Sequence, residues 1–144
     1  MSIWGIDQSL AGPQVATAGA DVACAAGTET NVISASLPVG FTGFNAVLFA
    51  DVACVIVIGA TAPTALVIAF RLGAGADVDT YVISPAALVA NAILQLSPAL
   101  AANLSRSSAG GNGTWNITVN ATGQAVTFKA NGRALFSFGL GADA

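Results

Sequence analysis

The stretch GTWNITVNATGQAVTFKANGRALFSFG, residues 113–139, decides the predicted fold. Over residues 115–120 apolar and polar side chains alternate strictly, which is typical of a strand with one buried and one solvated face. The dipeptide Asn131-Gly132 tolerates the positive φ angles of a type I′ turn, so we expect a β-hairpin there. The segment therefore predicts antiparallel β-sheet.

Similar strand patterns recur along the chain, separated by turns rich in Gly, Pro and Asn. No linker or internal repeat divides them, so we expect one domain over residues 13–144, preceded by an N-terminal arm over residues 1–12. About eight short antiparallel strands of this kind predict an all-β jelly roll or β-sandwich. We expect the strands at residues 14–23, 29–37, 45–58, 64–72, 80–84, 114–120, 125–130 and 134–138.

Residues 84–104 fit two different structures. Ser84-Pro85 resembles a helix N-cap followed by Pro at the first helical position, and the Ala and Leu content favours a short helix near residues 85–96. Apolar residues also recur at every second position up to Leu96, which favours a pair of strands. The sequence leaves both alternatives open.

The composition excludes several classes of function. Of the 144 residues 55% are hydrophobic and 8% are charged, and the net charge is −3. Four scattered basic residues cannot supply the phosphate contacts that a nucleic-acid-binding protein needs. The chain has no histidine, which excludes a Ser-His-Asp triad, a Cys-His pair and an imidazole zinc site. We therefore expect no enzyme, no catalytic residues, no cofactor and no nucleic-acid partner.

Two pairs of residues remain as candidates for chemistry. Cys24 and Cys54 lie among apolar residues, which favours two buried thiols over a disulfide. Asp77 and Asp79 form a close carboxylate pair after a glycine-rich loop. Two carboxylates are too few for a Ca²⁺ coordination shell, so we expect a solvated acidic loop and no metal site.

Membrane insertion is not expected. The uncharged stretches at residues 52–70 and 80–105 are interrupted by turn residues and prolines, so neither is typical of a spanning helix. The N-terminal residues lack the basic region and uninterrupted apolar stretch of a signal peptide.

Two expected strands are apolar on both faces. In residues 46–58 the charged exception is Asp51. A buried lone carboxylate is costly, so we expect Asp51 to be exposed, hydrogen-bonded or paired. One candidate for its ion-pair partner is Arg71 of the same or another subunit. Residues 65–70 have no exception. Because a sandwich buries one face of each sheet, we expect copies of the same chain to cover the outer faces. The predicted subunit-interface residues are Trp4, Ile6, Val47, Phe49, Val55, Val57, Leu66, Ile68 and Phe70.

Three segments resemble small jelly-roll (TNF-like) virion structural proteins of tailed bacteriophages, of the capsid decoration or cement type. These are TALVIAFRLGAGADVDTY at residues 64–81, the strand TETNV leading to Pro-Val-Gly within residues 28–40, and the Trp-led segment at residues 113–139. Proteins of this type commonly form trimers on a viral lattice and stabilise the shell without catalysis.

The resemblance implies a non-enzymatic virion structural protein, made in the host cytoplasm and located on the capsid surface. Its implied partners are its own copies, as a homotrimer, and the lattice of a major capsid protein, without nucleic acid or membrane. Two alternatives stay open. One is a phage fibre-tip or adhesin-type binding module, and the other is a small shell-forming capsid subunit that assembles on its own.

Overall fold

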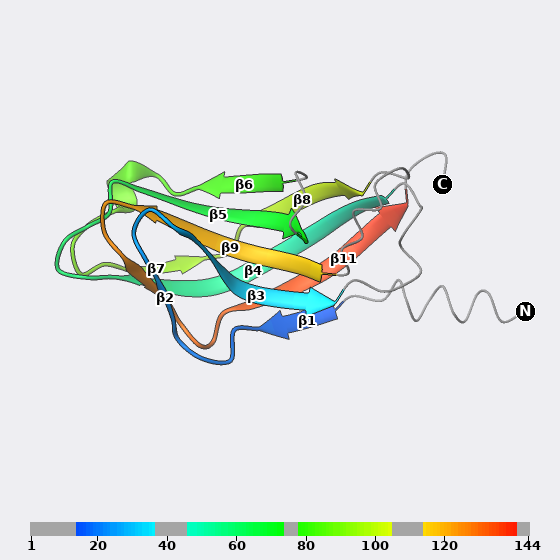
Figure 1. Cartoon of the computed structure of the whole chain (residues 1–144), viewed down its shortest axis with the longest axis horizontal. Coiled ribbons are helices and arrows are strands. Elements are labelled where there is room, and N and C mark those ends of the chain that lie inside the picture. The colour runs from blue at the N-terminus through cyan, green and yellow to red at the C-terminus, as the bar shows by residue number, and fades with distance from the viewer. Residues whose placement is uncertain (1–13, 37–45, 74–77, 105–113, 141–144) are drawn as a thin grey trace, which may run out of the picture.

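The computed structural model describes residues 14–36, 46–73, 78–104 and 114–140, and they form two stacked antiparallel sheets (Figure 1). This arrangement confirms the predicted β-sandwich. The strands are β1 (Gln14–Thr17), β2 (Val22–Cys24), β3 (Glu29–Ser36), β4 (Ala46–Ile58), β5 (Ala65–Leu72), β6 (Val78–Val82), β7 (Ile93–Leu96), β8 (Ala99–Leu104), β9 (Thr114–Thr122), β10 (Val126–Phe128) and β11 (Arg133–Leu140). No helix in the described part of the chain is long and apolar enough to cross a membrane.

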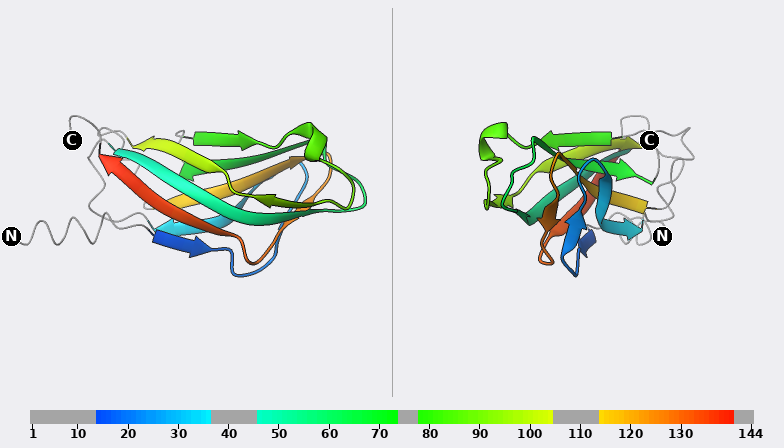
Figure 2. Two further views of the ribbon diagram at one scale, coloured as in Figure 1. Left: turned by 180° about the vertical axis from the view of Figure 1, so that it is seen from behind. Right: turned by 60° about the vertical axis from the view of Figure 1, so that its left-hand side comes forward.

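The larger sheet has seven strands and is organised around β4. β11 and then β10 pair with one edge of β4, β8 and then β7 pair with the other, and β1 and β2 extend the sheet beyond β11 and β10. The smaller sheet has four strands in the order β3-β9-β5-β6. Seen from behind, the larger sheet lies in front of β5 and β9 (Figure 2, left).

The core lies between the two sheets and follows from side-chain alternation. Every second residue of β4 from Leu48 to Ile58 points inward and is buried, and the same holds for Leu66, Ile68 and Phe70 of β5. Trp115 of β9 packs against Phe70 and Phe136, with ring centroids 6.2 and 5.0 Å away. These aromatic contacts join the two sheets.

Residues 84–104 contain the strand pair β7 and β8 rather than a helix of several turns. Ser84 and Pro85 begin a single 3-10 turn, η2 (Pro85–Ala87), as the N-cap pattern suggests, but the turn ends at once. β7 and β8 follow one another along the same edge of β4. Between them Pro98 has no N–H for the ladder, and its carbonyl instead accepts the Val52 N–H at 3.0 Å.

The predicted hairpin at Asn131-Gly132 is wrong. β10 and β11 both run antiparallel to β4 on the same edge, so the chain bulges outward between them without reversing. Neither Asn131 nor Gly132 is among the described residues with positive φ. Glycine is needed for another reason, because a Cβ on Gly132 would lie 2.2 Å from the ring of the fully buried Phe128.

The predicted strand over residues 14–23 is also interrupted, next to the connection between β10 and β11. β1 ends at Thr17 and β2 begins at Val22, and Gly19 adopts a φ of 74° between them. Asp21 accepts hydrogen bonds from the Ala130 N–H at 2.8 Å and from Lys129 Nζ at 2.6 Å. The two interruptions are therefore held to each other.

Replacing Gly132 by alanine should destabilise the fold by about 1–3 kcal/mol, because the new methyl group overlaps a buried ring. Gly59→Ala is the matched control, since a Cβ there meets nothing within 4 Å. Chemical denaturation measures both changes. Equal stability of the two variants would contradict the role assigned to the Gly132–Phe128 contact.

Candidate functional site

The outer surface of the larger sheet carries the strongest candidate for function. Its side chains come from the outward positions of β4 and from their neighbours in the register. Phe49 is 46% exposed, Leu135 40%, Val15 66% and Ile93 67%. We call this surface the apolar face, and it consists of Val15, Val47, Phe49, Ala53, Val55, Val57, Ile93, Ala99, Ala101 and Leu135.

Four of the predicted interface residues lie together on the apolar face. Phe49 is exposed, and Val47, Val55 and Val57 are half-buried on the same side of β4. Their contact with another subunit stays a prediction. Trp4 and Ile6 lie outside the described residues.

The prediction for Leu66, Ile68 and Phe70 needs correction. All three have 0% exposure in the single chain, because they point inward from β5 into the core. No surface is left on them for a second subunit. An uninterrupted apolar strand does not reveal which alternate residues face inward, and for β5 the outward set includes Val67 and Arg71.

The outer surface of the smaller sheet carries a polar network on β3, β9 and β5, whereas Val78 and Val82 are exposed on the edge strand β6. Glu29 of β3 forms a two-pronged ion pair with Arg71 of β5, including Nη2 to Oε2 at 3.0 Å, and accepts the Thr118 hydroxyl at 2.8 Å. Beside them Asn116 accepts the Ser34 hydroxyl at 2.7 Å and donates to the Gly73 carbonyl at 3.2 Å.

This network changes two expectations from the sequence. Asn116 and Thr118 point outward, as the alternation predicts, yet they are only 8% and 2% exposed because their neighbours cover them. Arg71 is held by Glu29 on the smaller sheet, so it does not pair with Asp51 within this chain. Asp51 itself is exposed, as expected.

Electrostatics at the network favour the charged forms. The hydrogen bond from Arg71 lowers the pKa of Glu29 below its usual 4.5. Burial of the carboxylate raises this pKa, but its effect is smaller. The same contact raises the pKa of Arg71. The ion pair is therefore formed at neutral pH.

Cys24 and Cys54 are free, buried thiols, which confirms the expectation of two thiols over a disulfide. Burial raises the pKa of Cys54 to about 11 and also raises that of Cys24. Both side chains are therefore protonated at neutral pH, when a thiol is a weak nucleophile.

Asp79 has a structural contact. Its carboxylate accepts the Ala101 N–H at 2.8 Å and the Thr80 N–H at 3.0 Å, which ties β6 to the edge strand β8. Asp77 lies outside the described residues. Within the described ranges no group of three His, Cys, Asp or Glu side chains comes together.

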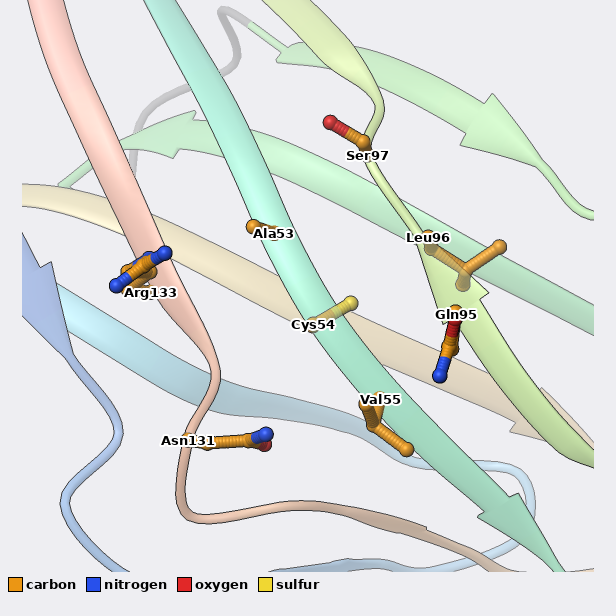
Figure 3. Close-up of a pocket in the computed structure, with 8 residues that line it drawn as sticks. All are labelled: Ala53, Cys54, Val55, Gln95, Leu96, Ser97, Asn131 and Arg133. Carbon is orange, nitrogen blue, oxygen red and sulfur yellow. The ribbon is translucent and has the colours of Figure 1, made fainter.

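A recess of about 400 Å³ opens where the strands flanking β4 are interrupted (Figure 3). Asn131, from the β10–β11 connection, and Ser97, from the β7–β8 connection, point toward β4 from opposite sides. Gln95 and Arg133 add an amide and a guanidinium. The remaining lining residues are Ala53, Cys54, Val55 and Leu96.

No protein-family model matches the chain, and no curated protein is similar to it in sequence. Two similar solved structures are described as the structure of infectious bursal disease virus Gx strain and the VP2 subviral particle of that virus. The identities are 12% and 11%, with TM-scores of 0.33 and 0.30. The matches cover 88% and 92% of this chain but 37% and 42% of those chains. Similarity at this level assigns no function.

Exchanging Glu29 for Gln should lower the free energy of unfolding at pH 7 by about 0.5–1 kcal/mol, since the ion pair is one-third exposed. The lowered pKa of Glu29 means that its contribution is present above pH 4.5 and is lost as the pH falls below that value. Urea denaturation of wild type and variant at pH 7 and pH 3 measures the difference. A difference of the same size at both pH values would contradict the assignment.

Proposed function

We propose that the chain is a non-enzymatic structural protein of a virion that associates with its own copies through the apolar face. The role proposed within that class is a capsid decoration (cement) protein, which binds the lattice of a major capsid protein as a homotrimer. The observation that carries the proposal is the apolar face itself, an exposed and largely hydrophobic surface of the larger sheet.

The chemistry of the two outer surfaces supports this assignment. On the outer surface of the smaller sheet a polar network pairs the side chains of β3, β9 and β5, and the exposed apolar residues there, Val78 and Val82, lie on the edge strand β6. Phe49 and Leu135 remain exposed on the other sheet, and large exposed apolar patches mark interaction sites. Contacts of this kind are driven mainly by removal of apolar area from water.

A decoration role uses such a surface in a particular way. A protein that binds the assembled shell better than its separate parts shifts the equilibrium toward the shell by mass action. It needs a rigid body and contact area but no reacting groups. The sandwich has a continuous core joined by Phe70, Trp115 and Phe136, which supplies that rigidity.

The described aromatic residues do not favour the fibre-tip or adhesin alternative. Trp115 is 1% exposed and belongs to the core. Tyr81 and Phe49 are exposed, but they lie on different sheets. These three side chains therefore do not line a common groove for a glycan.

The mass of the full chain in solution, measured by light scattering after size-exclusion chromatography, tests the proposal. We expect a soluble species of three times the chain mass of 14.1 kDa. A monomer at every concentration would contradict the proposal, and large closed particles would favour the shell-forming subunit.

Phe49→Lys should dissociate this species, because it places a charge within the apolar face. Val82→Lys is the matched control. Val82 is 63% exposed and lies on the outer surface of the smaller sheet, so this variant should keep the wild-type mass. Dissociation by both variants, or by neither, would show that the apolar face is not the contact.

A further inference from the structure

Two charged side chains in the described part of the chain make no ion pair or hydrogen bond, and they have opposite signs. They are Asp51 of β4 and Arg133 of β11. The other described charges are engaged: Lys129 with Asp21, Arg71 with Glu29, and Asp79 with backbone N–H groups.

Both unpaired charges lie on the outer surface of the larger sheet. The register places Arg133 opposite Ala53 and Asp51 opposite Leu135, so they occupy neighbouring strands two positions apart. They are exposed and surrounded by the apolar face. If another molecule covers this surface, both charges lose water, and that costs free energy unless they pair with each other or with opposite charges of the covering molecule.

A second copy of the same chain meets this requirement. It carries a carboxylate and a guanidinium in the same apolar surroundings, so Asp51 of one copy can face Arg133 of the next. The repulsion that a mismatched approach creates also selects one orientation of the two copies. Charge complementarity therefore favours a second copy of the chain as the occupant of the apolar face.

The recess beside Arg133 is lined by side chains that can bind a carboxylate. Arg133, Asn131, Gln95 and Ser97 line it with N–H and O–H donors, which are the groups that bind a carboxylate (Figure 3). Ala53 of β4, which lies opposite Arg133 in the register, also lines the recess, and its side chain is small. No acidic side chain is among the lining residues, and the nearest one in the register, Asp51 of the same chain, makes no ion pair with Arg133.

We propose that this recess is a socket for the Asp51 carboxylate of a second copy of the chain, which pairs with Arg133 there. In a homotrimer the Asp51 side chain of each copy enters the recess of the next copy, so three identical Asp51–Arg133 pairs close a ring. The inference rests on the proposed self-association and adds the residues that give it specificity. It replaces the expected Asp51–Arg71 contact, because Arg71 is already held by Glu29.

Charge reversal of the full chain tests the socket. Asp51→Arg and Arg133→Asp should each raise the dissociation constant of the assembly about tenfold or more, because each sets like charges against one another. The double variant Asp51→Arg/Arg133→Asp restores opposite charges and should recover most of the wild-type affinity. Sedimentation equilibrium measures the constants, and circular dichroism with thermal unfolding checks that each variant is folded.

Val82→Arg, on the outer surface of the smaller sheet, is the matched control for added positive charge and should leave the constant unchanged. Three results would overturn the socket: single reversals that leave the constant unchanged, a double variant as weak as the single ones, or an equal loss in Val82→Arg. These outcomes leave the proposed function standing if wild type is oligomeric. A monomeric wild type overturns both.

Discussion

Side chains alternate along β4 between the core and the outer surface of the larger sheet, and both layers of the sandwich are built on this alternation. β4 pairs with four other strands, and its inward residues from Leu48 to Ile58 supply a large part of the core. A shift of one residue in its register would exchange the inward and outward sets. The same alternation places Phe49 and Asp51 outside, so the strand that organises the core also determines the apolar face.

Strand positions were predictable where a local pattern coincides with the final environment. β9 follows the alternation from Trp115, and β4 follows its long apolar run. The hairpin predicted at Asn131-Gly132 was wrong because the type I′ turn is only a local preference of this dipeptide. In the structure Gly132 instead leaves room for the Phe128 ring. The choice between a short helix and strands at residues 84–104 was left open by the sequence, because backbone pairing with β4 decides it and no local signal contains that pairing.

The candidate site was predictable only in part for a related reason. The sequence shows that β4 and β5 are apolar on both sides, but it does not show which residues a second sheet covers. For β4 the outward choice of Phe49 agrees with the structure, and for β5 the choice of Ile68 does not. The partner of Arg71 is Glu29, 42 residues away, and only the pairing of β3 and β5 with β9 brings them together.

Hydroxyl-radical footprinting of the full chain, dilute and concentrated, tests most directly that the apolar face is covered by other copies. If other copies cover this face, oxidation of Phe49 and Leu135 falls as the chain associates, while oxidation of Tyr81 on β6 stays constant. Unchanged oxidation of Phe49 in a concentrated, associated sample would contradict self-association through the apolar face, because the copies would then meet through another surface.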